Sequence, residues 1–270
     1  MPSLDFDSGA ADYKKLAEAV NHRVATAALK HVPQPKPGSR ILDLACGTGV
    51  ATSAVMDIVN AQSINPPPTV IGIDIAEGMI KLYQTKVNSE QWNTVSCRVQ
   101  DCQNLQGFHD QEFQMVLMNF GIMFMPDAPR TVQEIYRVLK PGGHAVFTTW
   151  KENVLANLLA RAALAVQAPP ADLAPKDEWQ TDEKLILTVH VGGFKMRNIQ
   201  VFVEEEVWEG GSADGIVDSY STPFWNVLKD GTEESNVKWR KAVRKQLTPE
   251  ERESGSIDMI AWVCVAEKDF

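Results

Sequence analysis

Short apolar runs alternate with amphipathic segments up to Trp150, and this alternation constrains the fold more than any other feature of the chain. The apolar runs are Ile41–Ala45, Val70–Asp74, Val95–Gln100, Phe113–Met118 and Ala145–Trp150. Segments with helical spacing lie between them, at Val50–Asn60, Glu77–Val87 and Ala128–Leu139, the last closed by Pro141–Gly143. Such a pattern predicts an α/β protein with a doubly wound, mainly parallel sheet that helices cover on both faces.

Further segments extend this core at both ends. Apolar residues recur at helical spacing over residues 11–32, which predicts an opening helix. Ile199–Val203 and Ile257–Val265 are typical of strands and are expected to join the same sheet, which then has seven strands. The other segments, at 1–38, 151–198 and 208–256, are predicted to form a helical substrate cap within a single domain that spans residues 1–270.

Charge and cysteine usage narrow the range of partners. The chain has 26 Lys and Arg against 35 Asp and Glu, a formal net charge of −9, which disfavours binding to a phosphate backbone. Four irregularly spaced cysteines predict reduced thiols. Neither a basic leader nor a run of 18 apolar residues occurs. We therefore expect a cytoplasmic protein that binds neither nucleic acid nor a membrane, with its oligomeric state left open.

The turn Asp43–Gly49 joins the first strand to the next helix, where open α/β sheets bind ligands. A dinucleotide fingerprint requires a small residue at position 52, which is Thr52 here. A phosphate-binding loop requires Gly-Lys-Ser/Thr, yet no lysine lies between Arg40 and Lys81. Both departures disfavour NAD and ATP as ligands of this turn.

S-adenosylmethionine fits the remaining features of the turn. Gly47 and Gly49 lack a Cβ, so the main chain can pass close to the methionyl and ribosyl parts of this cofactor. Asp43 is expected to place negative charge near its ammonium group, or alternatively only to cap the next helix. Asp74, at the end of the second strand, is expected to accept hydrogen bonds from both ribose hydroxyls.

Five motifs then occur in register within residues 39–150. They are Ile41–Gly49, Gly72–Asp74 with Met79, Gln100–Cys102, Met118–Phe120 and Arg137–Gly143. In this order they resemble the successive motifs of class I S-adenosylmethionine-dependent methyltransferases, with Ala45 in the place of the family's first glycine. The resemblance implies a methyltransferase of Rossmann-like fold whose cofactor-binding core is residues 39–150.

The same resemblance implies roles for residues around the adenine. Asp101 would bond the adenine amino group, and Cys102 would supply backbone contacts at the ring. Ile75 and Met79 would pack on the purine. The alternative interpretations are a turn-forming aspartate for Asp101 and a small buried residue for Cys102.

Three further residues are placed by the resemblance near the methionyl part. The backbone at Asn119 and Phe120 would meet the ammonium group, and Tyr13 in the opening helix would close over the cofactor. An apolar position on an amphipathic helix is the alternative interpretation of Tyr13. The segment Phe6–Leu29, the strand ending at Trp150 and the Gly192–Phe194 turn also resemble fungal small-molecule methyltransferases, among them the gliotoxin thiol methyltransferase.

The acceptor is less determined than the cofactor. Methyl transfer is an in-line displacement in which positioning supplies much of the catalysis. Because no convincing general base stands out, a thiol or amine of a hydrophobic secondary metabolite is the favoured acceptor, and no catalytic residue is assigned. The alternatives are an O-methyltransferase of phenolic or quinone-like substrates and a binding protein that does not transfer the methyl group. The five histidines are scattered and no metal-ligand spacing occurs, so no metal is expected.

Aromatic residues are frequent in the irregular segments expected to hold the substrate. They are Trp179, Phe194, Trp208, Tyr220, Phe224, Trp225 and Trp239. The segment Pro223–Leu228 is the candidate for a lid that faces the substrate.

Overall fold

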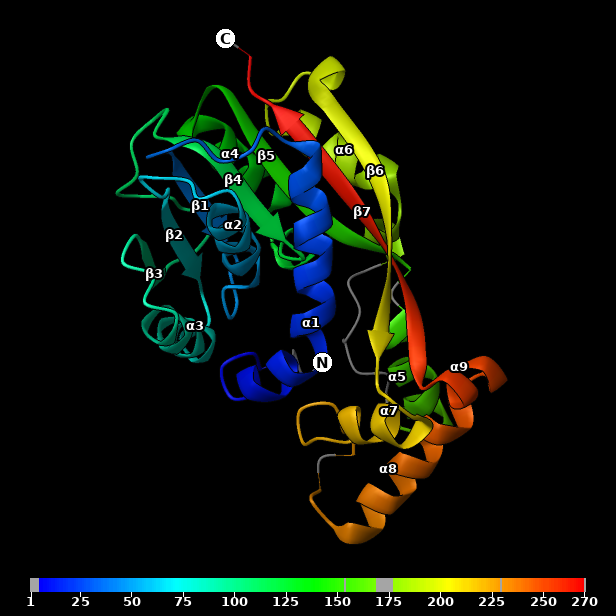
Figure 1. Cartoon of the computed structure of the whole chain (residues 1–270). Helices are drawn as coiled ribbons and strands as arrows, with labels where there is room; N and C mark the ends of the chain where they lie inside the picture. The colour runs from blue at the N-terminus through cyan, green and yellow to red at the C-terminus, as the bar shows by residue number, and fades with distance from the viewer. Residues whose placement is uncertain (1–4, 153, 169–176, 229, 270) are drawn as a thin grey trace.

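One seven-stranded sheet forms the centre of the computed structural model, which describes residues 5–152, 154–168, 177–228 and 230–269 (Figure 1). Its strands are β1 (Arg40–Leu44), β2 (Thr69–Asp74), β3 (Val95–Val99), β4 (Phe113–Asn119), β5 (Leu139–Glu152), β6 (Ile199–Glu209) and β7 (Ser256–Glu267). They lie in the order β3-β2-β1-β4-β5-β7-β6, and β7 alone runs antiparallel to its neighbours β5 and β6. The predicted seven-stranded, mainly parallel sheet is confirmed.

Helices cover both faces of this sheet. The α-helices of the described residues are α1 (Ala10–Ala28), α2 (Val50–Ala61), α3 (Glu77–Ser89), α4 (Ala128–Val138), α5 (Val154–Ala165), α6 (Asp182–Val191), α7 (Ala213–Ser219), α8 (Glu233–Gln246) and α9 (Pro249–Ser254), of which α5 and α7 to α9 lie below the sheet in Figure 1. In Figure 1, α1 and α2 lie in front of the sheet, and α4 and α6 lie behind it. The chain moves outward from β1 to β3 and then returns to β4 on the other side of β1, which places the switch in strand order between β1 and β4.

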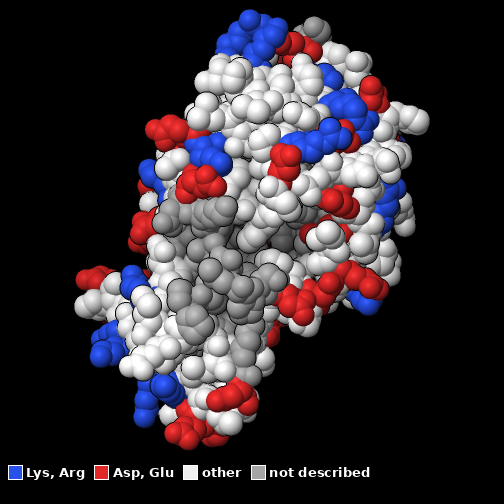
Figure 2. All heavy atoms as spheres, turned by 180° about the vertical axis from the view of Figure 1, so that it is seen from behind, with Lys and Arg blue, Asp and Glu red and all other residues white. Residues whose placement is uncertain are grey.

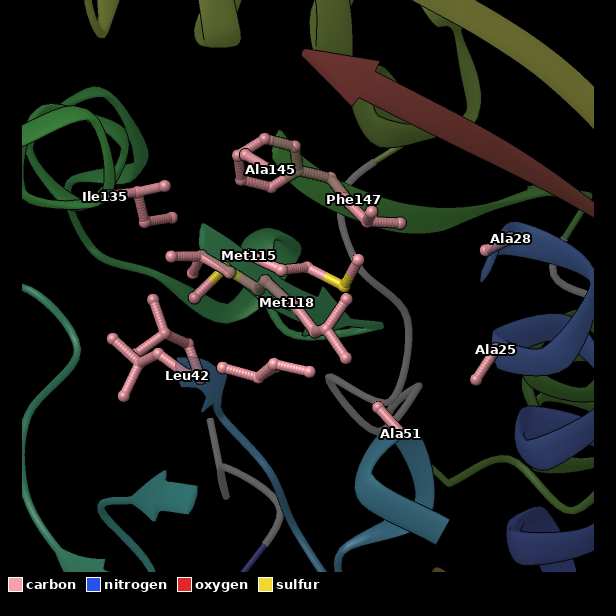
Figure 3. Close-up of a cluster of buried hydrophobic side chains, with 14 of the residues drawn as sticks. Ala25, Ala28, Leu42, Ala51, Met115, Met118, Ile135, Ala145 and Phe147 are labelled. Carbon is pink, nitrogen blue, oxygen red and sulfur yellow. The ribbon is translucent and has the colours of Figure 1, made fainter. Parts of the chain in front are cut away.

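The main hydrophobic core lies between the sheet and these helices (Figure 3). Leu42 of β1 and Met118 of β4 are completely buried. The side chains of Ala25 and Ala28 in α1 and of Ala51 in α2 are buried and point toward the strands (Figure 3). Because alanine is small, these two helices can pack closely on the strands that carry the candidate site.

A second hydrophobic core joins α5, α7 and α8 below the sheet in Figure 1. Trp239 of α8 is fully buried in it, and its indole Nε1 donates to the carbonyl oxygen of Tyr220 at 2.8 Å. Leu16 and Val20 of α1 belong to this second core, whereas Val24 of the same helix belongs to the main core. Helix α1 therefore connects the sheet to the helices below it.

The structure divides the segment 151–198, which was predicted to belong wholly to the substrate cap. Helix α5 packs in the second core, as a cap helix would. Helix α6 packs on α4, and its Leu185 and Val189 are buried in the main core together with Trp179 and Phe194. The part around α6 thus completes the cover of the sheet, and residues 153 and 169–176 of the predicted cap lie outside the described residues.

The Pro141–Gly143 motif lies inside β5, which corrects the prediction that it closes a helix at Leu139. Helix α4 ends at Val138, and β5 begins at the next residue. The register between β4 and β5 then jumps, so that Pro141–Gly143 protrude from the ladder, where the backbone of Lys268 bonds to Gly142 and Gly143 at 2.7 and 2.9 Å. The bulge therefore gains its hydrogen bonds from the C-terminal segment.

Charged side chains of both signs are interspersed on the face shown in Figure 2. Large areas between them carry neither sign. None of the helices in the described part of the chain combines the length and apolar character needed to cross a bilayer.

Candidate functional site

The turn after β1 has a left-handed backbone at three residues: φ is 49° at Ala45, 51° at Gly47 and 79° at Gly49. A Cβ on Gly49 would lie 2.4 Å from the ring of Tyr83, so packing as well as conformation requires glycine there. A Cβ on Gly47 would meet no atom within 4 Å. The space beside Gly49 is therefore filled by Tyr83 of α3, whereas the space beside Gly47 is open.

Asp74, at the end of β2, holds this turn in place. One carboxylate oxygen accepts a hydrogen bond from the Gly47 N–H at 2.9 Å, and the other accepts one from the Ala76 N–H at 2.9 Å. Burial raises the pKa of Asp74, and these backbone donors oppose that effect. Because a carboxylate has about four lone-pair positions, Asp74 can still accept hydrogen bonds from a ligand.

Asp43, at the end of β1, is buried with one oxygen bonded and one unbonded. Its Oδ2 accepts from the Thr52 backbone N–H at 3.1 Å and from the Thr52 hydroxyl at 2.7 Å, which holds the first turn of α2. Its Oδ1 is buried and has no hydrogen-bond partner within the described part of the chain. Burial raises the pKa of Asp43 to about 7. The residue therefore caps the helix and still has an oxygen that can face a positive charge.

The residues predicted to surround an adenine follow β2 and β3. Ile75 has an exposed fraction of 72%, although it is apolar, whereas Met79 is buried beneath Ala10 of the N-terminal helix. Asp101 is exposed and accepts from the Gln103 N–H at 2.8 Å in a local turn.

Cys102 is buried, and its sulfur accepts a hydrogen bond from the Ala45 N–H at 3.2 Å. Burial raises the pKa of this thiol to about 12, so it stays protonated near neutral pH. Its side chain thus supports the turn after β1. Gln100 N donates to the Asp74 carbonyl at 2.9 Å, so the ends of β1, β2 and β3 are joined at one edge of the sheet.

The end of β4 completes this edge. Phe120 has a φ of 54°, an uncommon value for a bulky residue, and its N–H donates to the Thr148 hydroxyl at 2.9 Å. The Thr148 hydroxyl in turn donates to Asn119 Oδ1 at 2.8 Å. The Phe120 ring is stacked on Trp150, with ring centroids 4.0 Å apart. The left-handed backbone therefore turns Phe120 toward the end of β5.

An apolar pocket begins at Phe120 and lies between the sheet edge and the second core. Its walls come from the N-terminal segment, α1, the end of β4, α5 and the segment around α7. They are formed by Phe6, Tyr13, Leu16, Ala17, Val20, Asn21, Phe120, Met123, Phe124, Trp150, Leu155, Ala156, Leu159, Tyr220 and Trp225. The pocket therefore contacts both the cofactor edge and the helices below it.

Tyr13 lines the pocket and also packs against Ala76 and Met79, which follow β2. Its hydroxyl oxygen accepts from the Asn21 amide at 3.2 Å, and Asn119 donates to the Asn21 carbonyl at 3.3 Å. Burial raises the pKa of Tyr13, and the nearby charge of Asp74 adds to this effect. The hydroxyl therefore remains protonated at neutral pH.

Three residues that line the pocket each have a buried side-chain polar atom without a hydrogen-bond partner among the described residues. These atoms are Asn21 Oδ1, the Tyr220 hydroxyl and Trp225 Nε1. Their residues have exposed fractions of only 6%, 0% and 7%. Buried polar groups are bonded in the great majority of cases, so three exceptions in one pocket indicate a place for a polar ligand.

The sequence pointed to part of this pocket. Trp225, within the predicted lid Pro223–Leu228, lines it, and Phe224 packs against Phe6 with centroids 6.1 Å apart. Asn21 was missed, although its position was informative. It lies four residues after Ala17 and three before Val24, so a polar side chain occupies the apolar stripe of the opening helix.

Within the described ranges, His, Cys, Asp and Glu side chains form no group of three or more that could hold a metal ion.

Comparison with known proteins adds an independent observation. A family model described as the ubiE/COQ5 methyltransferase family matches residues 5–162. A demethylmenaquinone methyltransferase of Symbiobacterium thermophilum is 37% identical over 112 residues, which cover 41% of this chain and 42% of the relative. The enzyme of the same name from Staphylococcus carnosus is 33% identical over 144 residues, covering 52% and 56%. The chain spans about half the length of the curated relatives it matches.

Solved structures with similar folds cover more of the chain. Phosphoethanolamine N-methyltransferase 2 of Haemonchus contortus, in complex with S-adenosyl-L-methionine, has a TM-score of 0.59 and 17% identity, covering 100% of this chain and 61% of that one. The [4+2]-cyclase SpnF has a TM-score of 0.56 and 14% identity, covering 92% and 81%. At these identities the likeness shows the fold alone.

Proposed function

This chain belongs to the ubiE/COQ5 methyltransferase family, and from that premise we propose that it transfers a methyl group from S-adenosylmethionine to an oxygenated aromatic ring of the quinone type. Membership of the family confirms the predictions of a methyltransferase and of its cofactor. The expected thiol or amine acceptor gives way to the quinone-like alternative, because the relatives are named for demethylmenaquinone. Those relatives are bacterial, and the predicted likeness to fungal thiol methyltransferases finds no support among them.

The residues at the sheet edge fit the cofactor. Asp43 has a buried oxygen without a partner, which suits a positive charge, and Asp74 has lone pairs that suit the ribose hydroxyls. Gly47 faces open space, and the exposed Ile75 offers an apolar surface for the purine. When bound, S-adenosylmethionine supplies a methyl group that leaves its sulfur as the acceptor's electron pair forms the new bond.

The apolar pocket at Phe120 is the single observation that carries the proposed acceptor. Most of its lining is aromatic or aliphatic and only a few polar side chains take part, which is the composition usual for small-molecule sites. Phe120 and Tyr13 belong both to this pocket and to the edge where the cofactor residues meet. An aromatic acceptor in the pocket therefore lies beside the proposed cofactor site, where close positioning of reacting atoms contributes about 7–11 kcal/mol.

The lining residues orient the acceptor and keep water away from it. Neither a carboxylate nor a histidine is among the described side chains that line the pocket. The Tyr13 hydroxyl is held protonated by its raised pKa, so it can donate a hydrogen bond but does not serve as a base at neutral pH. The acceptor is therefore expected to lose its proton to water, and an electron-rich phenolic ring suits this requirement.

Transfer of a tritium-labelled methyl group tests the proposal. The purified chain is supplied with labelled S-adenosylmethionine and, in separate reactions under nitrogen, naphthohydroquinone, thiophenol or aniline. We expect the label to appear in the naphthohydroquinone. Labelling of the thiol or the amine alone would contradict the proposed acceptor. Cofactor binding without labelling of any acceptor would contradict methyl transfer itself and favour a binding protein.

A further inference from the structure

We propose that Asn21, Tyr220 and Trp225 recognise the oxygen atoms of the acceptor and so determine its specificity. This inference rests on the proposed function, because it concerns the acceptor of that reaction. Each of the three residues lines the apolar pocket and has a buried side-chain polar atom without a partner among the described residues. An unpaired polar atom at such depth is unfavourable, and a ligand with matching groups removes that cost.

The chemistry of the three atoms is complementary. Asn21 Oδ1 only accepts hydrogen bonds, and the indole Nε1 of Trp225 only donates them. The Tyr220 hydroxyl can do either. The set therefore matches an aromatic ring that carries at least one hydroxyl to donate to Asn21 and a second oxygen to accept from Trp225 or Tyr220.

The recognition atoms are held in position before a ligand binds. The Asn21 amide nitrogen donates to the Tyr13 hydroxyl at 3.2 Å, which directs Oδ1 away from that bond. The backbone carbonyl of Tyr220 accepts from the Trp239 indole at 2.8 Å, and the backbone N–H of Trp225 donates to the Thr222 carbonyl at 3.1 Å. The backbones of Tyr220 and Trp225 are thus fixed, and all three residues are buried, so little side-chain freedom remains to be lost on binding, which favours selectivity.

The apolar part of the pocket wall favours the hydrocarbon ring of the acceptor, whereas the three polar atoms favour its oxygen atoms. Leu16, Val20 and Leu159 offer only hydrocarbon to the ring. A naphthalene without oxygens fills such a wall but leaves the three polar atoms unpaired. Because a site that provides hydrogen bonds discriminates strongly against analogues that lack the matching group, the oxygenated ring binds more tightly.

Binding of three related compounds provides the test. Naphthohydroquinone, naphthol and naphthalene are titrated under nitrogen into the full chain saturated with S-adenosylhomocysteine, and their affinities are measured by calorimetry. We expect the wild-type protein to bind naphthohydroquinone at least about tenfold more tightly than naphthalene, a difference of about 1.4 kcal/mol, with naphthol between them. Equal affinities would overturn the proposal.

Two near-isosteric variants then assign the effect to residues. Tyr220→Phe removes only the hydroxyl, and Trp225→Phe removes the indole N–H while retaining an aromatic ring. Each should reduce the preference for naphthohydroquinone over naphthalene about fivefold. Trp262→Phe is the matched control, because the Trp262 indole in β7 donates to the Gln180 carbonyl at 2.9 Å, away from the pocket lining, and the preference should not change. An unchanged preference in both pocket variants would overturn the assignment.

Unfolding midpoints in urea separate recognition from a structural role. Tyr220→Phe deletes a buried hydroxyl without a partner, so the midpoint should stay equal or rise. A lower midpoint with unchanged ligand preference would mean that the hydroxyl supports the fold. The binding test is independent of methyl transfer: preference without transfer leaves the recognition set standing while the proposed function fails, and transfer without preference does the reverse.

Discussion

The proposed cofactor edge and the proposed acceptor pocket lie side by side, but they differ in how far their polar groups are hydrogen-bonded within the protein. At the edge, Asp74 bonds two backbone N–H groups, and Asn119 bonds Thr148. In the pocket, the polar atoms of Tyr220 and Trp225 are without partners among the described residues. The contrast teaches that the chain builds its cofactor site by itself, whereas the polar part of the acceptor site is completed by the ligand.

Asp43 is an exception at the cofactor edge, because its buried Oδ1 has no hydrogen-bond partner among the described residues. The pH dependence of stability that follows from this is the largest effect we predict. Burial raises its pKa to about 7, while in the unfolded chain it ionises near its usual value of about 3.8. Between these values the folded protein holds a proton that the unfolded chain has lost, so the free energy of unfolding decreases as pH rises. At about 1.4 kcal/mol per pH unit, the decrease amounts to about 4 kcal/mol and ends above about pH 7.

Urea unfolding of the wild type and of Asp43→Asn at a series of pH values measures this effect. The variant keeps an oxygen for Thr52 but does not ionise, so its stability should lack this decrease with rising pH. The difference between the two proteins removes the contributions of other titrating groups. If the free energies of unfolding of the two proteins differed by a constant amount from about pH 4 to pH 8, the pKa of Asp43 would not be raised in the folded protein, and the expected contrast would fail.

The two glycines of the turn separate folding from binding. Gly49→Ala places a methyl group 2.4 Å from the Tyr83 ring at a φ of 79° and should lower the free energy of unfolding by about 3 kcal/mol. Gly47→Ala meets no neighbour, so it should cost only about 1 kcal/mol, from its φ of 51°, and should instead weaken cofactor binding. Unfolding curves and calorimetry distinguish the two outcomes, and equal losses of stability would contradict the division.

Asp74→Ala should weaken binding of S-adenosylmethionine at least about tenfold, about 1.4 kcal/mol, because the variant loses the proposed ribose contacts and the bonds that hold Gly47 and Ala76. Calorimetry measures this affinity. The affinity of the acceptor pocket for naphthohydroquinone serves as the internal control and should change much less. Unchanged cofactor affinity would refute the ribose assignment.

The cofactor edge could be predicted from sequence because its requirements are local. Glycine at a left-handed position and an acid directly after a strand leave a signature at fixed spacing, as Gly47, Gly49 and Asp74 do. The strands were predicted for the same reason, since their apolar runs are continuous. Only the bulge at Pro141–Gly143 was misplaced, because its hydrogen bonds come from the distant Lys268.

The pocket could not be predicted in the same way because its wall is assembled from distant segments. Asn21 and Trp225 lie about two hundred residues apart in the chain and meet only when α1 joins the second core. Composition was a poor guide there: Trp179 and Phe194 belong to the main core, although both are aromatic residues of the predicted cap. Which aromatic residues face a ligand depends on helix packing, which local spacing does not encode.

The second core has a consequence for how acceptor preference is separated from cofactor binding. The family model matches residues 5–162, so α7, α8 and α9 lie beyond the part of the chain that it matches. Tyr220 and Trp225 are in that outlying part, whereas Asp74 and Gly47 are inside the matched one. Under the proposed assignment, substitutions at Tyr220 and Trp225 are therefore expected to alter the preference for an acceptor while leaving the proposed cofactor contacts of Asp74 and Gly47 in place.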